Sequence, residues 1–136
     1  MLSCEKPNVR VLIVDDHELT RFCLKLALST QKNIELVGMA SNGQEAIEMV
    51  ERYYPDVVIL DLQMPVMDGL TAAIEIKRLK PDIQLIAYSS YNEFQTESDK
   101  QSAKIDAFCR KEAATTELIN LVNQLGKRQM GADCRN

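Results

Sequence analysis

The sequence predicts an open α/β fold in which helices cover both faces of a five-stranded parallel sheet. Short apolar runs alternate with longer segments of helical periodicity, which is typical of repeated strand–helix units. The run at 57–60 is continuously apolar and the run at 9–14 is mostly apolar, as expected of parallel strands buried on both faces. Both runs end at carboxylates. Five such units predict a doubly wound sheet with right-handed crossovers and the strand order 2-1-3-4-5.

Composition limits the class of protein. With 136 residues, 46% hydrophobic and 26% charged, the chain fits one globular domain. It has neither the ~20-residue apolar run of a membrane span nor a signal-peptide pattern, so we expect a cytoplasmic protein without membrane contact. A net charge of −4 without a basic block argues against direct nucleic-acid binding by this segment. The cysteines lack C-x-x-C spacing, which favours core positions for Cys23 and Cys109 and terminal positions for Cys4 and Cys134.

The first half of the chain predicts two strand–helix units. A strand at 9–14 precedes a helix at 18–29. The buried stripe of that helix should consist of its apolar residues at helical spacing, namely Leu19, Phe22, Cys23, Leu26 and Ala27. A strand at 34–40 precedes a second helix, which Pro55 ends. Asn42 and Glu45 have the spacing of a capping box at its start.

The second half predicts three further units, with strands at 57–60, 83–88 and 106–109 and helices at 70–79, 91–103 and 115–125. The helix at 91–103 has few apolar residues to bury, so we expect it to be short or frayed. The domain should span 9–125. Residues 1–8 would form an N-terminal extension, and 126–136 a C-terminal tail or the start of a linker.

Side chains that can bind metals or take part in reactions follow the strands of the predicted sheet. They converge at its carboxyl edge, and they are Asp15, Asp16, Asp61, Ser89 and Lys111. Clustered carboxylates repel one another unless a cation balances them. Mg²⁺ prefers oxygen ligands and binds through one or two carboxylates together with a phosphate oxygen. The edge is therefore predicted to hold Mg²⁺ and a phosphoryl group together.

Asp61 is the candidate nucleophile, because it follows the central strand between the acid pair and the lysine. A carboxylate can attack phosphorus to form an aspartyl phosphate. Lys111 would supply a compact positive charge and Ser89 a hydroxyl donor to the phosphoryl oxygens. Since phosphoryl transfer depends mainly on positioning and charge stabilisation, no further base is required.

The ordered set of Asp15-Asp16, Asp61 in D-L-Q-M-P-x-M-D-G, Ser89 and Lys111 resembles the receiver domain of two-component response regulators. The intervals from Asp16 through Asp61 and Ser89 to Lys111 are 45, 28 and 22 residues. The resemblance implies a flavodoxin-like (CheY-like) (βα)5 fold. It also implies a signalling domain rather than an enzyme, with only self-phosphorylation and autodephosphorylation expected.

The resemblance also assigns partners and roles. Asp61 would be phosphorylated by a sensor histidine kinase or phosphotransfer protein, and a homodimer is compatible with the family. The resemblance gives the Mg²⁺ ligands as Asp15, Asp16, Asp61 and the backbone carbonyl of Gln63. Ser89 and Phe108 would form the pair that switches the interaction surface.

Two short signatures are similar to the NarL/FixJ class. They are the D-D-H at 15–17 and the glutamate after Lys111. Members of that class usually carry a helix-turn-helix output domain. We expect His17 to be structural or to support the acid residues without binding the metal itself, since a lone histidine after two acids is a weak indication of a metal ligand or phosphodonor.

Two other functions compete with this assignment. A phosphatase resembling haloacid dehalogenases needs a second acid two residues after the nucleophile, and Gln63 occupies that position. The second alternative is a receiver-like interaction domain that acts independently of phosphorylation. The intact acid set argues against it, whereas the polar segment at 91–103 is compatible with it.

Overall fold

The computed structural model describes residues 8–62, 64, 69–90 and 104–134. Within these ranges five parallel strands form one sheet in the order β2-β1-β3-β4-β5. The strands are β1 Val9–Val14, β2 Ile34–Ala40, β3 Val57–Leu60, β4 Gln84–Ser89 and β5 Ala107–Arg110. The predicted order is confirmed, and only the bounds of β4 and β5 differ, each by one residue.

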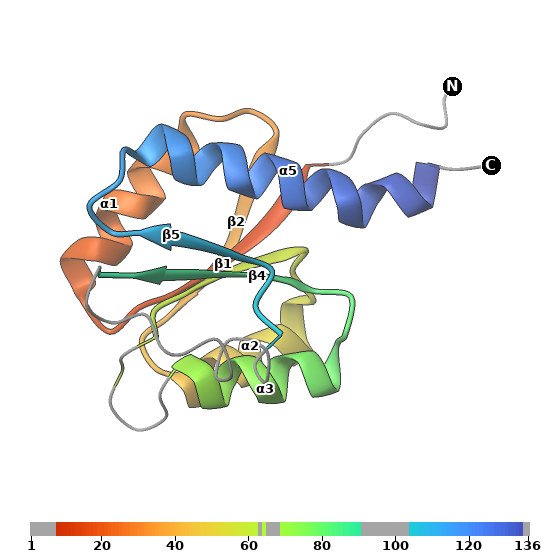
Figure 1. Ribbon diagram of the computed structural model, residues 1–136, viewed down its shortest axis with the longest axis horizontal. Helices are drawn as coiled ribbons and strands as arrows, with labels where there is room; N and C mark the ends of the chain where they lie inside the picture. Colours follow the sequence, from red (N-terminus) through yellow and green to blue (C-terminus); the bar gives the residue numbers. More distant parts are fainter. Residues whose placement is uncertain (1–7, 63, 65–68, 91–103, 135–136) are drawn as a thin grey trace.

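Helices cover both faces of the sheet (Figure 1). They are α1 Glu18–Ser29, α2 Gly43–Tyr53, α3 Gly69–Leu79 and α5 Thr115–Cys134. Side chains of α1 and α5 pack against one face in a first apolar cluster, and those of α2 and α3 pack against the other face in a second. The helix expected at 91–103 lies outside the described residues. None of the helices in the described ranges combines the length and apolar character that a membrane span requires.

The start of α2 confirms the capping prediction with one change. Asn42 Oδ1 accepts a hydrogen bond from Glu45 N at 2.9 Å. The Glu45 carboxylate reaches back to the backbone N–H of Ser41 at 2.8 Å, one residue before the expected partner. Both bonds satisfy N–H groups at the start of the helix that lack intrahelical partners. At the other end, Tyr54 adopts a left-handed conformation with φ of 52°, and the chain then passes Pro55 into β3.

The predicted buried stripe of α1 is wrong. Leu24 and Leu28 are buried, whereas Leu19, Phe22 and Leu26 are 73%, 53% and 51% exposed. Cys23 is also exposed, so it is not a core cysteine, while Cys109 is buried as expected. Because α1 has apolar side chains nearly all round, periodicity alone could not decide which stripe faces the sheet.

The end predicted for the last helix is also wrong. α5 does not stop at Leu125 but continues to Cys134. In Figure 1 its C-terminal part runs past the edge of the sheet where the strands begin. Gly126 directly follows the predicted end of the helix. It is buried, and a Cβ atom there would lie 2.6 Å from Val9 Cγ2. This glycine therefore permits close packing of α5 on β1. The expected domain boundary at residue 125 falls inside a helix.

Candidate functional site

The register of β1 and β3 brings two carboxylates level with each other. Val14 pairs with Leu60 at the ends of the two strands, so Asp15 and Asp61 are the next residues on adjacent strands. Asp61 N continues the ladder by donating to Val14 O at 2.9 Å, and Asp15 N donates to Ala40 O at 3.1 Å. Both aspartates are 1% exposed. The parallel register, rather than any local motif, thus creates the buried acid pair predicted at this edge.

Lys111 is the cation facing this acid pair. Its Nζ atom lies 3.1 Å from Asp15 Oδ2 and 3.5 Å from Asp61 Oδ2. The Lys111 backbone N donates to Ser89 O at 2.9 Å, which fixes the residue at the end of β4. Burial alone would lower the pKa of Lys111, but the carboxylates of Asp15 and Asp61 outweigh burial and raise it. The ammonium therefore stays charged and partly neutralises the two buried acids.

Tyr88 lies against the same lysine, with its ring centroid 5.9 Å from Lys111 Nζ. The tyrosine is 8% exposed, and burial raises the pKa of its hydroxyl. A cation held over an aromatic face is stabilised by the quadrupole of the ring. Sequence reasoning did not assign a role to Tyr88. Its position directly before Ser89 at the end of a predicted strand was the available signal.

His17 lies beside the acid cluster and contacts it, which is compatible with the structural or supporting role expected for it. Its Nδ1 atom is 3.1 Å from Asp15 Oδ1 and 3.1 Å from Asp16 Oδ1. Its backbone N–H also donates to Asp15 Oδ1 at 2.9 Å. One ligand atom from each of Asp15, Asp16, His17 and Asp61 can be chosen so that all four atoms lie within 4.8 Å of one another.

The two residues expected to switch the surface occupy different environments. Ser89 is the last residue of β4 and is fully buried. Phe108 lies on β5 opposite Ala87 of β4 and is partly buried. It lines a hollow of about 560 Å³ together with Arg110, Glu112, Ala113 and Glu117.

The turn after Asp61 is shaped by a close approach of α3. Gly69 N donates to Leu62 O at 3.0 Å. A Cβ atom at Gly69 would collide with the Asp61 carbonyl oxygen and would lie 2.5 Å from Leu62 Cα. Gly69 is therefore needed for tight packing of the start of α3 on the acid-bearing turn. Gln63, whose backbone carbonyl was expected to be a Mg²⁺ ligand, lies outside the described residues.

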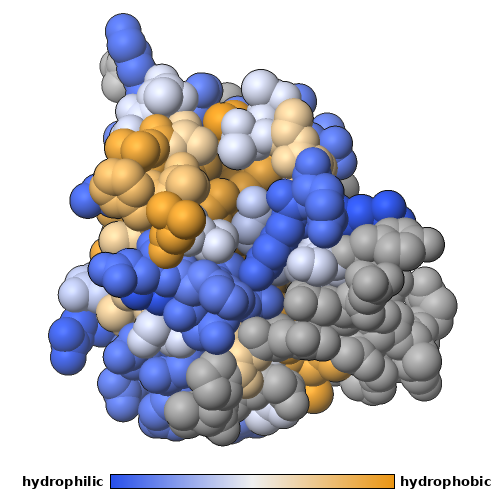
Figure 2. All heavy atoms as spheres, turned by 90° about the vertical axis from the view of Figure 1, so that its left-hand side faces the viewer, coloured by the Kyte–Doolittle hydropathy of each residue, from blue (hydrophilic) through white to orange (hydrophobic). Residues whose placement is uncertain are grey.

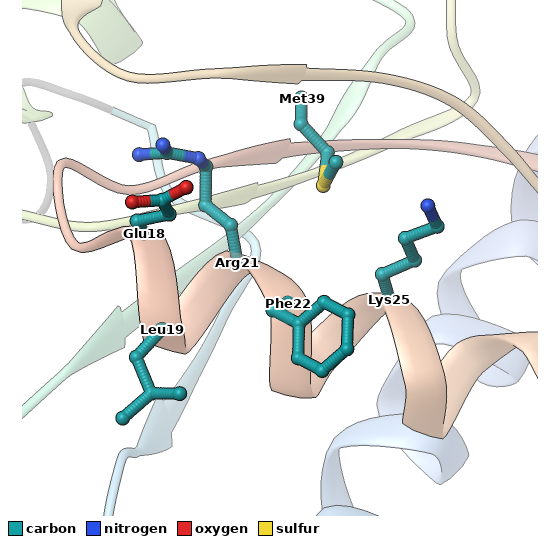
Figure 3. Close-up of a pocket in the computed structure, with 6 residues that line it drawn as sticks. All are labelled: Glu18, Leu19, Arg21, Phe22, Lys25 and Met39. Atoms are coloured by element: carbon teal, nitrogen blue, oxygen red, sulfur yellow. The ribbon is translucent and has the colours of Figure 1, made fainter.

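A second hollow lies beside the acid cluster on α1. It measures about 420 Å³ and is lined by Glu18, Leu19, Arg21, Phe22, Lys25 and Met39. In Figure 3, Arg21 and Lys25 extend from α1 on either side of Met39, which points from β2 toward the helix. Arg21 Nη1 also donates to Asp15 O at 2.7 Å, and so links the hollow to the acid cluster. Sequence reasoning missed this arginine, which follows His17 by about one helical turn.

The edge view in Figure 2 shows an apolar patch beside a hydrophilic band. The exposed large apolar residues of α1 are Leu19, Phe22 and Leu26. Exposed apolar patches with a polar rim often mark interaction sites. This patch begins on the first turn of α1, which follows Asp15 and Asp16 closely in the sequence.

The chain belongs to the response regulator receiver domain family, whose model matches residues 11–123. VraR of Staphylococcus aureus is 33% identical over 120 residues, covering 88% of this chain and 57% of VraR. The chain thus spans little more than half the length of such curated relatives.

Solved structures agree with this family. The receiver domain of the putative response regulator NarL from Mycobacterium tuberculosis has a TM-score of 0.79 and 29% identity, covering 90% of this chain and 98% of that one. The response regulator domain of Thermotoga maritima CheB has a TM-score of 0.79 and 27% identity, covering 88% of this chain and 97% of that one. A CheX–CheY–BeF3–Mg²⁺ complex from Borrelia burgdorferi has a TM-score of 0.79 and 26% identity. This match covers 88% of this chain and 90% of that one.

These similarities establish the class of protein. The chain is a CheY-like receiver domain of two-component response regulators, and it is similar to the receiver domains of VraR and NarL. This class consists of signalling domains, generally not enzymes, that partner with histidine kinases. Receiver domains bind Mg²⁺ at an acidic cluster, and Asp15, Asp16 and Asp61 form a candidate cluster here.

Proposed function

We propose that Asp61 accepts a phosphoryl group from a histidine kinase or phosphotransfer protein and that Lys111 and Ser89 contact the product. One observation carries this proposal. Asp61 is 1% exposed beside a second buried aspartate, and the lysine that faces both acids lies 3.5 Å from Asp61 Oδ2. A buried carboxylate next to another acid costs free energy unless it is compensated. A role in a reaction therefore explains this arrangement better than a contribution to folding stability does.

The acid set fits Mg²⁺. Its three carboxylates are hard oxygen donors, and Lys111 balances only part of their charge. In addition, Asp16 Oδ1 is buried and accepts no hydrogen bond within the described part of the chain. We assign Asp15, Asp16 and Asp61 as the side chains that hold Mg²⁺. The carbonyl of Gln63 remains a predicted fourth ligand. Bound Mg²⁺ would offset negative charge on the phosphoryl oxygens.

In the proposed step, a carboxylate oxygen of Asp61 attacks the phosphorus atom of a phosphohistidine donor. The new bond joins this oxygen to phosphorus, while the phosphorus–nitrogen bond of the donor breaks and its electron pair stays on the imidazole nitrogen. Lys111 would stabilise the charge on the transferred group, and Ser89 would donate its hydroxyl hydrogen to a phosphoryl oxygen. Beyond accepting this group and losing it again by hydrolysis, we expect no turnover.

We further propose that Ser89 and Phe108 transmit the change to the surface around β5. The partial burial of Phe108 and the hollow beside it support this role, because the ring can exchange one packing position for another. The altered surface would bind a downstream partner or a second copy of the chain. We expect these events in the cytoplasm, without direct contact between this segment and nucleic acid.

The exposed apolar patch on α1, formed by Leu19, Phe22 and Leu26, supports contact with a protein phosphodonor. It borders the acid cluster, because α1 begins three residues after Asp15. A donor protein that packs on this patch would bring its phosphohistidine to the edge where Asp61 lies. A small-molecule donor would not need the patch.

Intact-mass spectrometry tests the phosphoacceptor. The wild type is incubated with acetyl phosphate, with and without Mg²⁺, beside Asp61→Asn and the control Asp82→Asn, which changes an exposed acid outside the cluster. We expect one Mg²⁺-dependent phosphoryl adduct on wild type and Asp82→Asn, and none on Asp61→Asn. A normal adduct on Asp61→Asn would refute the assignment. No adduct on any protein would favour the phosphate-independent interaction domain.

The α1 contact is tested separately with Phe22→Ser. Its phosphorylation by acetyl phosphate should match that of the wild type, since Phe22 lies outside the acid cluster. Its phosphorylation by a phosphorylated kinase partner should be slower. Equal rates with the protein donor would exclude this patch as the contact.

A further inference from the structure

The acid cluster contains one nitrogen donor that the Mg²⁺ assignment does not use. His17 Nδ1 lies 3.1 Å from Asp15 Oδ1 and equally far from Asp16 Oδ1. The position of the residue is fixed by two contacts to the same carboxylate, since both its backbone N and its Nδ1 lie within hydrogen-bond distance of Asp15 Oδ1. The imidazole thus points into the cluster although its side chain is 63% exposed.

A structural role accounts for only part of this arrangement. A single ring nitrogen can donate one hydrogen at a time. His17 Nδ1 is aligned for a hydrogen bond to Asp15 Oδ1, while Asp16 Oδ1 remains buried and accepts no hydrogen bond from the described residues. A neutral, purely structural histidine leaves that oxygen without a hydrogen bond from the described residues, whereas a cation contacting all three atoms would balance its charge.

The spacing of the three atoms suits shared coordination. Ligand atoms about 2.1 Å from an octahedral metal lie about 3.0 Å from their neighbours and about 4.2 Å from the opposite ligand. The two nitrogen–oxygen distances of 3.1 Å match neighbouring positions. The full set, including Asp61, lies within 4.8 Å, so a small closure would bring it to coordination distances.

We infer that His17 is a metal ligand that shifts the selectivity of this site toward divalent metals that favour imidazole, such as Ni²⁺ and Zn²⁺. The inference rests on the proposed metal-binding function and deepens it. Three carboxylates alone suit Mg²⁺, whereas an added imidazole nitrogen suits first-row transition metals. Competition between metals would then depend on one exposed side chain.

The test compares the association constants of Ni²⁺ and Mg²⁺ by titration calorimetry on untagged protein. Wild type is compared with His17→Ala and with His17→Asn, whose side-chain amide can replace the Nδ1 hydrogen bond but not the imidazole ligand. Because His17 is exposed, we expect both variants to fold. The ratio of the Ni²⁺ to the Mg²⁺ constant should fall about tenfold or more in both variants.

A spectroscopic measurement gives independent support. His17 is the only histidine of the chain, so any imidazole proton signal shifted by bound paramagnetic Ni²⁺ belongs to it. Asp16→Asn serves as the control for location, since it should weaken both metals if they share the acid cluster. We expect the shifted imidazole signals in wild type and their absence from both His17 variants.

The outcomes separate this inference from the proposed function. If wild type binds Mg²⁺ but shows no shifted imidazole signal, or if His17→Asn restores the wild-type metal ratio, the role of His17 as a ligand is wrong and the Mg²⁺ site stands. If wild type binds neither metal, the proposed metal site itself fails.

Discussion

Lys111 Nζ lies closer to Asp15 Oδ2, at 3.1 Å, than to Asp61 Oδ2, at 3.5 Å. One ammonium thus serves two buried carboxylates and is held mainly by the one that we do not assign as phosphoacceptor. A phosphoryl group on Asp61 would add negative charge on that side, so the lysine has a reason to move toward it.

This relationship predicts the behaviour of Lys111→Ala. The variant should accept some phosphoryl group from acetyl phosphate but should show a weakened conformational response, because the charge that contacts the phosphate is missing. Intact mass would give the phosphorylated fraction, and amide NMR shifts around β5 would give the response. Lys25→Ala is the control, since Lys25 is exposed. A full set of shifts in Lys111→Ala would contradict the role given to Lys111.

The same contacts predict a pH dependence at the alkaline end. The carboxylates of Asp15 and Asp61 outweigh burial and raise the pKa of Lys111 above its usual 10.5. A pKa raised by folding stabilises the folded state below 10.5, and this contribution disappears as the pH rises through the folded value. Urea unfolding from about pH 9 to about pH 12 should therefore show the advantage of wild type over Lys111→Met shrinking above pH 10.5. An advantage that grows there would contradict the assigned sign.

Gly69→Ala should destabilise the fold by about 1–3 kcal/mol or more, because the added Cβ meets the backbone of Asp61 and Leu62. Gly38→Ala is the matched control. Its Cβ would meet side chains rather than backbone, those of Leu12 and Met49 at 3.3 Å and that of Tyr53 at 3.7 Å, so a cost within about 1 kcal/mol is expected. Urea denaturation measures both. Equal costs would mean that the turn after Asp61 can relax.

Two leucines of α1 test the corrected orientation of that helix. Leu24→Ala should cost about 2–5 kcal/mol, because Leu24 is 2% exposed within the core. Leu26→Ala should change the free energy of unfolding by no more than about 0.5 kcal/mol, because Leu26 is 51% exposed. Since both variants remove the same atoms from the same helix, the difference isolates burial. The reverse ranking would restore the stripe predicted from sequence.

Lys104 adopts φ of 56°, a left-handed conformation that costs a side-chain-bearing residue about 1 kcal/mol or more. Lys104→Gly should therefore raise the midpoint of thermal unfolding. Lys104→Ala removes the same exposed side chain without relieving the backbone, so it should produce no such gain. Equal midpoints for the two variants would show that the conformation carries no measurable strain.

Much of the fold could be predicted because its signals are local. Short, mainly apolar runs rich in β-branched residues indicated the strands at 9–14 and 57–60, and alternation with helical segments implied the parallel sheet and its order. The candidate site followed from the same topology, since residues just past parallel strand ends must meet at one edge. Asp15, Asp61 and Lys111 do meet there.

The errors arose where several solutions satisfied the local pattern. The helix at 18–29 carries more apolar residues than one face can bury, and only packing against α5 and the sheet selected Leu24 and Leu28. Glycine often follows the end of a helix, but at Gly126 the absence of a side chain instead permits close contact with Val9. Both the buried face of α1 and the role of Gly126 depend on contacts with residues far away in the sequence.

The sequence by itself determined the order of the elements, the family and the set of acids, because periodicity and spacing are properties of the chain. Only the tertiary structure decided how closely those groups approach. The β1–β3 register sets Asp15 level with Asp61, and the turn after β1 aims the His17 imidazole at two carboxylates. Distances of 3.1 Å between groups on different elements depend on how those elements pack, and packing is a property of the folded chain as a whole.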